Sequence, residues 1–145
     1  MRSVLFDTSL YITALRTGDE ARIYFRRIAE GAAVWLSSVV LEELFAGASE
    51  RDRDTIDRLA RDFSKIGRIL VPNLADWIRT GKVLALLGAR YDYEQIGRGR
   101  LTNDALIATS AARRGVTVIT ANARDFEKLA EFQPFQWRVE KLGAS

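Results

Sequence analysis

Short apolar runs alternate along the chain with longer segments in which apolar residues recur three or four positions apart. The short runs predict β-strands, and they cover residues 4–6, 33–36, 69–71, 116–120 and 137–139. The longer segments predict helices, and they cover residues 8–15, 19–30, 39–48, 50–65, 74–90, 102–114 and 125–131. This alternation predicts an α/β fold with a mostly parallel central sheet.

Turn-forming and capping residues mark the boundaries between several of these segments. Two glycines predict a loop over residues 91–100. Thr102 and Asn103 follow this loop and are suited to cap the next helix. Gly115 is suited to end that helix before strand 116–120 begins.

The length and composition predict one globular domain. The chain has 145 residues, of which 48% are hydrophobic and 28% are charged, and it has no linker, repeat or low-complexity segment. We therefore expect a single domain over residues 1–145. No apolar run is long enough to cross a membrane, and the first residues lack the apolar stretch of a signal peptide, so we expect a cytoplasmic protein.

The residue types that are missing narrow the chemistry available to this chain. It contains no histidine and no cysteine, which excludes a Ser-His-Asp triad, a thiolate nucleophile, and imidazole or thiolate metal ligands. Hydrolysis would therefore depend on carboxylates, lysine, tyrosine or a metal held by oxygen ligands. The net charge of +3 is compatible with a nucleic-acid partner without requiring one.

Acidic side chains follow the predicted strands. The carboxyl ends of parallel strands lie at one edge of a sheet, so residues that follow strands are expected to meet there. The residues that follow strands are Asp7 after the first, Glu42 and Glu43 after the second, and Asn122 and Asp125 after strand 116–120. Asp104 opens the helix that precedes strand 116–120, so we expect it near the same edge. Taken one at a time, the aspartates also suit helix caps and the glutamates suit a solvated helix surface.

Of these acidic residues, Asp104 is the one that a structural role explains least well. Its helix spacing places it on the same face as Ile107, Ala108 and Ala111, and a carboxylate on an apolar face is costly without a partner. Glu42 and Glu43 flank the apolar stripe of their own helix on opposite sides. Periodicity does not say which of the two faces the edge of the sheet.

A divalent cation would satisfy these carboxylates together. Each pair of ionised carboxylates about 4 Å apart costs on the order of 4 kcal/mol at an effective dielectric constant of 20. Oxygen-only ligands suit Mg²⁺ or Mn²⁺, and such an ion can activate water and stabilise a phosphoryl transition state. The residues therefore predict metal-assisted hydrolysis of a phosphodiester.

Four segments carry these residues in a distinctive order. They read VLFDTSL at residues 4–10, SVVLEELFAG at 38–47, LTNDALIAT at 101–109 and VITANARDF at 118–126. In this order they resemble the motifs of PIN domains, in particular the VapC-type toxin ribonucleases of toxin–antitoxin pairs. The resemblance implies a Rossmann-like three-layer α/β/α sandwich and a Mg²⁺-dependent endoribonuclease, with Mn²⁺ as the alternative ion.

The resemblance also implies roles for individual residues. It assigns Asp7 and Asp104 as metal ligands, and it selects Glu43 over Glu42 because the family's second acid precedes a leucine. The fourth acidic position of the family falls on Asn122 or Asp125. Many members have aspartate where Asn122 stands.

Contacts with RNA and with protein partners are also expected. Candidate substrate contacts are Thr8, Arg98, Arg100 and Arg124, with Lys128 nearby, while Trp35 and Trp77 are expected in the core. The resemblance implies a short VapB-like antitoxin that occupies a groove beside the acids and often inserts an arginine, and it implies a homodimer. For this groove we expect the exposed sides of helices 8–15 and 38–48, with Tyr11, Ile12 and Phe45 as candidates.

Four other functional classes share part of this sequence pattern. A non-catalytic PIN-like module that binds nucleic acid would be favoured by loss of Asp7, Glu43 or Asp104, all of which are present. A housekeeping RNA-processing nuclease would share the same site. A phosphorelay receiver would need a lysine at the end of a late strand, and none of the predicted strands ends in one. Flap-type DNA nucleases are usually longer and richer in acids.

Overall fold

The computed structural model describes residues 2–18, 25–26, 29–92 and 98–140, and for residues 98–100 it describes the backbone alone. The strands are β1 (Arg2–Phe6), β2 (Ala32–Ser37), β3 (Ile69–Leu70), β4 (Thr117–Thr120) and β5 (Trp137–Val139). The helices are α1 (Thr8–Thr17), α3 (Ser38–Gly47), α4 (Glu50–Lys65), α5 (Leu74–Tyr91), α7 (Arg98–Arg114) and α8 (Ala123–Ala130). The α/β class and the order of elements predicted from the sequence are confirmed.

Two details differ from the sequence predictions or lie beyond the described chain. The helix expected over residues 19–30 falls largely outside the described residues. The loop expected over residues 91–100 is wrong at its end, because α7 already begins at Arg98. A glycine inside a helix costs only about 1 kcal/mol, which tertiary packing readily offsets. Thr102 and Asn103 therefore both lie inside α7 and do not cap it.

All strands of the described sheet run parallel, in the order β3-β2-β1-β4-β5. The chain steps from β1 to β2 and β3 in one direction and then returns to place β4 on the other side of β1. In the β1–β4 pair, Phe6 lies opposite Ile119. The connections that leave β1 and β4 therefore diverge, which leaves a crevice at the carboxyl ends of these two strands.

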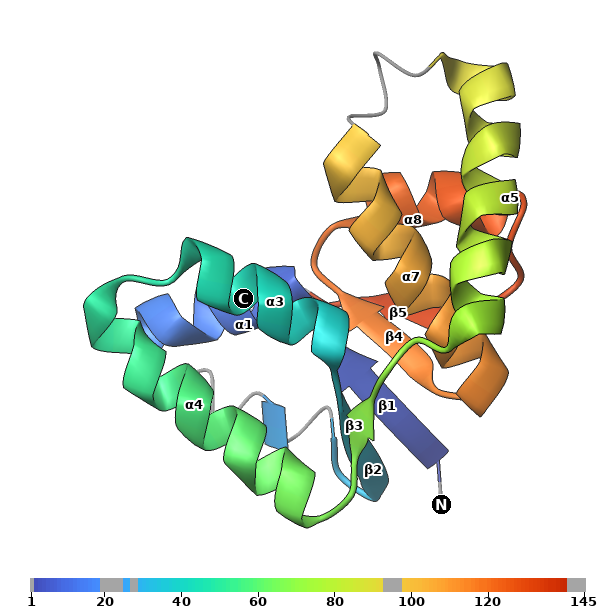
Figure 1. The fold of residues 1–145 in the computed structure, drawn as a ribbon. Coiled ribbons are helices and arrows are strands. Elements are labelled where there is room, and N and C mark those ends of the chain that lie inside the picture. The colour runs from blue at the N-terminus through green and yellow to red at the C-terminus, as the bar shows by residue number, and fades with distance from the viewer. Residues whose placement is uncertain (1, 19–24, 27–28, 93–97, 141–145) are drawn as a thin grey trace.

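The helices are divided between the two faces of the sheet. Right-handed crossovers place helices that follow β1 and β2 on one face and helices between β3 and β5 on the other. Figure 1 shows α1, α3 and α4 on one side and α5, α7 and α8 on the other, with α3 near the carboxyl edge. α3 packs against both α1 and α7, so the two halves of the molecule meet beside the crevice.

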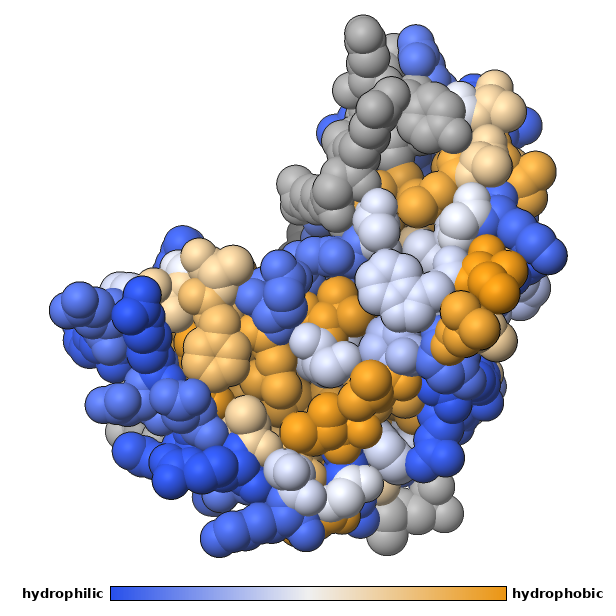
Figure 2. Space-filling view, viewed as in Figure 1, coloured by the Kyte–Doolittle hydropathy of each residue, from blue (hydrophilic) through white to orange (hydrophobic). Residues whose placement is uncertain are grey.

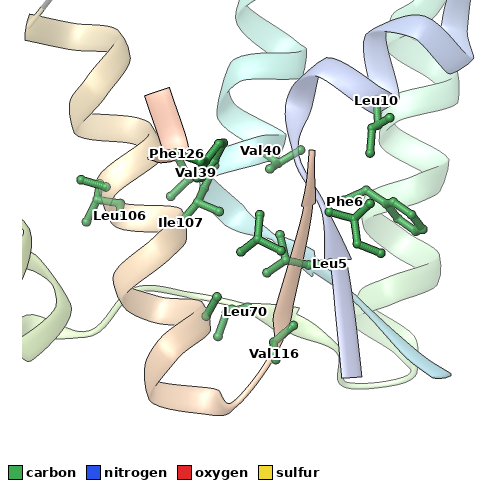
Figure 3. Close-up of a cluster of buried hydrophobic side chains, with 14 of the residues drawn as sticks. Leu5, Phe6, Leu10, Val39, Val40, Leu70, Leu106, Ile107, Val116 and Phe126 are labelled. Carbon is green, nitrogen blue, oxygen red and sulfur yellow. The ribbon is translucent and has the colours of Figure 1, made fainter. Parts of the chain in front are cut away.

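Apolar side chains from both layers fill the space around the central strands (Figure 3). Leu5 of β1, Val40 of α3 and Ile107 of α7 are each 0% exposed. Burial of such a side chain contributes about 1.5–3 kcal/mol, so this cluster fixes α3 and α7 relative to the sheet. Within the described residues, no helix combines the length and the apolar character needed to cross a membrane.

Candidate active site

Asp7 lies at the crevice, directly after the central strand β1. Its backbone N–H donates to the carbonyl oxygen of Ile119 at 2.9 Å, which ties the end of β1 to β4. Its side chain caps α1, because Oδ1 accepts hydrogen bonds from the Ser9 backbone N–H at 2.8 Å and from Ser9 Oγ at 2.5 Å. Asp7 therefore caps α1 as expected. It also lies at the switch point of the sheet, the crevice where the connections from β1 and β4 diverge.

Two hydroxyl groups orient the Asp7 carboxylate, and neither of them was predicted from the sequence. Thr120, the last residue of β4, donates from Oγ1 to Asp7 Oδ2 at 2.6 Å and accepts the Asn122 backbone N–H at 2.9 Å. Ser9 Oγ also accepts the backbone N–H of Ala121 at 3.2 Å. These bonds link the turn after β1 to the turn after β4. The sequence signal was one hydroxyl residue shortly after β1 and another at the end of β4, but its meaning depends on β1 and β4 being neighbours.

The electrostatics of Asp7 favour a cation. Asp7 is 5% exposed, and this burial raises the pKa of its carboxyl above the ordinary value, against the opposing effect of hydrogen bonds from Ser9 and Thr120. Among the described side chains, no lysine or arginine forms an ion pair with Asp7. A buried carboxylate that is hydrogen-bonded but lacks a counter-charge suits an oxygen-ligated divalent ion.

The two adjacent glutamates of α3 take different partners. Glu43 is half-buried, and its Oε1 accepts a hydrogen bond from Thr8 Oγ1 at 2.7 Å. Because Thr8 directly follows Asp7, this bond brings Glu43 to the side of α3 that faces Asp7. Glu42 is exposed, and its Oε2 accepts a hydrogen bond from Asn103 Nδ2 of α7 at 3.3 Å. Each glutamate therefore lies on its own flank of the crevice.

Asp104 lies on α7 next to Asn103 and is half-buried. Ile107, Ala108 and Ala111, which helical spacing places on its face, are each 0% exposed, but so is Ser110 on another face. Asp104 therefore lies near the start of a stretch of α7 that is buried on all sides, and the role of its carboxylate stays a prediction.

The candidates after β4 occupy the start of α8. Asn122 is the residue that precedes the helix, and its side chain makes no capping hydrogen bond. Asp125 lies in the first turn and is half-buried, while Arg124 is exposed. Arg98 and Arg100 belong to the first turn of α7, and their side chains lie outside the described part of the structure.

A complete metal site is not assembled among the described residues, because no group of three or more acidic side chains there lies close enough to hold an ion. The donor chemistry nevertheless fits Mg²⁺ or Mn²⁺, because Asp7, Glu43 and Asp104 offer only oxygen ligands. The convergence of these three carboxylates on one ion stays a prediction.

Two grooves border the α1–α3 side of the site. One has a volume of about 240 Å³ and is lined by residues that include Ile12, Leu15 and Glu43. The second has a volume of about 420 Å³, and its lining includes Tyr11, Leu15 and Ile56. Leu15, Leu44 and Asp52 line both, so the two grooves adjoin and extend from Glu43 toward α4. Tyr11 is buried at the floor of the larger groove, whereas Ile12 is 39% exposed.

Solved structures share this fold. A chain of the DNA-bound VapBC structure from Salmonella typhimurium is 23% identical with a TM-score of 0.68, and the match covers 96% of this chain and 98% of that one. A chain of VapBC2 from Rickettsia felis, bound to a promoter DNA fragment, is 21% identical with a TM-score of 0.69 and coverage of 96% and 99%. For VapBC-1 from nontypeable Haemophilus influenzae the values are 22%, 0.66, 94% and 97%.

At the level of sequence, curated proteins and family profiles give different results. No curated protein matches this chain. The profile of the PIN domain matches residues 4–132, which includes every acidic position described above. This chain therefore belongs to the PIN domain family.

Proposed function

We propose that this chain is a divalent-metal-dependent endoribonuclease and the toxin component of a toxin–antitoxin pair. The observation that carries the nuclease proposal is Asp7, a buried carboxylate held by Ser9 and Thr120 at the switch point of the sheet. Membership of the PIN family supports the reaction class. The toxin role is supported by the likeness to chains of VapBC structures.

In the proposed reaction, Asp7, Glu43 and Asp104 hold Mg²⁺ or Mn²⁺. The ion supplies charge stabilisation at the phosphate and activation of the attacking water. The Ser9 and Thr120 hydroxyls keep the Asp7 carboxylate in one orientation, so that little reorganisation is needed when the ion binds. Thr8 holds Glu43 on the side of α3 that faces Asp7.

RNA phosphates require cationic or polar groups at the edge of the site. Arg124 is exposed at the start of α8 and is suited to contact a phosphate. Arg98 and Arg100 are proposed for the same role from the start of α7, and Asn122 or Asp125 for the fourth position of the site. Thr8 stays a candidate substrate contact, although its hydroxyl already donates to Glu43.

The test is RNA cleavage by the purified chain with Mg²⁺ or Mn²⁺ and with EDTA. We expect cleavage with the ions and none with EDTA, and we expect Asp7→Asn to lower the rate at least 100-fold. Single-stranded DNA of the same sequence tests the choice of RNA. RNA that binds but stays intact would favour the non-catalytic PIN-like module and overturn the proposed enzyme.

The proposed partner is a short VapB-like antitoxin that lies in the grooves beside α1, α3 and α4. Their lining combines apolar side chains with charged ones, and Glu43 lines the smaller groove, where an arginine of the partner can pair with it. Of the predicted groove residues, Ile12 lines the smaller groove and Tyr11 the larger, while Phe45 is 37% exposed on α3.

Growth assays test the toxin role in cells. Expression of the chain alone should arrest growth, and Asp7→Asn should abolish the arrest. Co-expression with the adjacent upstream reading frame should restore growth and yield a stable complex without ribonuclease activity. A wild-type chain that cleaves RNA but leaves growth unaffected, with no co-purifying partner, would favour a housekeeping RNA-processing nuclease.

We also propose a homodimer. The exposed face of α5 carries Leu74, Trp77 and Ile78, which are 74%, 54% and 51% exposed. Figure 2 shows apolar residues along α5 on this face of the molecule. Trp77 was expected in the core, and its exposure corrects that expectation. Sedimentation of wild type and of Trp77→Ser tests the proposal: a wild type that stays monomeric at micromolar concentration would overturn it.

A further inference from the structure

α3 presents two adjacent glutamates to two different helices. Glu43 Oε1 accepts a hydrogen bond from Thr8 of α1 at 2.7 Å, and Glu42 Oε2 accepts one from Asn103 of α7 at 3.3 Å. Neighbouring residues of a helix project about 100° apart, so one acid reaches one flank and the next acid reaches the other. α3 is thereby linked at its polar surface to both halves of the molecule.

The contact between α3 and α7 has an apolar part and a polar part. Its apolar part lies in the core, where Val39 of α3 and Ile107 of α7 belong to one cluster of buried side chains (Figure 3). Its polar part is the bond between Glu42 and Asn103, which lie 61 residues apart in the sequence. Asn103 directly precedes Asp104, and Glu42 directly precedes Glu43. This bond therefore ties together the turn of α3 that carries Glu43 and the turn of α7 that carries Asp104.

From this geometry we infer that Asn103 is a positioning residue, which holds Glu42 and thereby sets the separation between Glu43 and Asp104. The inference rests on the proposed function, in which those two carboxylates share a divalent ion. Without the ion, their mutual repulsion tends to separate α3 from α7. The neutral amide of Asn103 opposes this separation by donating to Glu42. It also keeps the Glu42 carboxylate on its own flank, away from the place assigned to Glu43.

The test is calorimetric titration of the full chain with Mn²⁺, which measures the affinity for the ion. Asn103→Ala and Glu42→Ala should each weaken Mn²⁺ binding by about 3- to 10-fold, the range expected for loss of one hydrogen bond in an exposed pair that solvent screens. The double variant should bind no more weakly than either single variant, because both remove the same bond. Glu42→Gln is the matched control, and it should bind Mn²⁺ within about twofold of wild type because its side-chain oxygen still accepts the amide.

Thermal melts in EDTA separate positioning from a general loss of stability. All four variants should melt within about 3 °C of wild type, since an exposed pair contributes little to folding. Equal loss of binding in Glu42→Gln and Glu43→Gln would overturn the inference and make Glu42 a ligand. Additive losses of affinity in the double variant would overturn the inference and leave the proposed function intact. The same holds if Asn103→Ala binds Mn²⁺ like wild type while Glu43→Gln no longer binds it. A wild type that binds no Mn²⁺ would overturn both.

Discussion

Replacement of Thr120 by valine removes one hydroxyl from the centre of the site and little else. Thr120 is 0% exposed, and valine keeps its branched shape in the strand. The lost hydroxyl donates to Asp7 Oδ2 at 2.6 Å and accepts the Asn122 backbone N–H at 2.9 Å. A hydrogen bond with a charged group contributes about 1.5–3 kcal/mol. For a chain of 145 residues, this corresponds to a fall of about 3–12 °C in Tm at neutral pH.

The cost of this substitution should depend on pH. Burial raises the pKa of Asp7 above 3.8, its ordinary value. Between 3.8 and the folded-state pKa, the folded chain therefore keeps a proton that the unfolded chain has lost. The free energy of unfolding thus falls as pH rises through the folded-state pKa, and it is not reduced in this way below pH 3.8. Thr120→Val removes a bond that opposes the shift, so it raises the pKa of Asp7 further. The cost should be greater at pH 8 than at pH 4, where a neutral carboxyl loses about 0.5–1.5 kcal/mol.

The measurement is urea unfolding in EDTA at pH 4, 6 and 8. Thr109→Val is the matched control, because Thr109 is also a buried threonine, at 4% exposure, and shares its hydrogen bond at 3.1 Å with the neutral hydroxyl of Thr80. Its cost should be the same at each pH. In an Asp7→Asn background, the pH dependence of Thr120→Val should disappear. A cost of Thr120→Val that is equal at pH 4 and pH 8 would refute the argument that this hydroxyl acts through the charge of Asp7.

Three further predictions address the acids and the frame that carries them. Asp104→Asn should raise the Tm of the metal-free chain by relieving repulsion between carboxylates, and it should weaken Mn²⁺ binding in calorimetry; a variant that is only destabilised would contradict the shared site. Glu43→Gln should lower metal-dependent RNA cleavage by about 100-fold or more, whereas Glu42→Gln should stay near wild type in the same assay, and the reverse order would show that the wrong flank was assigned. Arg113→Leu should cost about 1–3 kcal/mol in urea unfolding, because Arg113 Nε donates at 2.9 Å to Asp76, which is 4% exposed; an unchanged midpoint would show that water replaces the arginine.

The order of elements was predictable because each strand and helix carries its own periodic pattern. Helix α4 matches its predicted bounds, since its charged face and apolar stripe continue over its whole length. Gly115 has a φ of +68° and ends α7 as expected. The start of α7 was not predictable from local composition, because burial of Leu101 and Ala105 favours helix there more strongly than the nearby glycines oppose it.

Local patterns located the candidate acids but not their environment. The edge of the sheet followed from the alternation of strands and helices, and Asp7 was placed at it correctly. The roles of Ser9 and Thr120 depend on β1 and β4 being neighbours, and strand order is a property of the whole fold. The partners of Glu42 and Glu43 were undetermined for the same reason, because helical periodicity gives the direction of each side chain but not the element that it meets.

The bond between Thr120 and Asp7 joins residues 113 positions apart, which has a consequence for synthesis on the ribosome. At about 5–20 residues per second, Asp7 is added to the chain about 6–23 s before Thr120, the residue that orients it. Parallel pairing of β1 with β4 also has to wait for that late segment, since contacts distant in sequence form slowly. A nascent chain therefore carries an unformed pocket until β4 has been synthesised, and the crevice beside Asp7 forms only then. The fold itself thus delays the assembly of this site until Thr120 has been added and β4 can pair with β1.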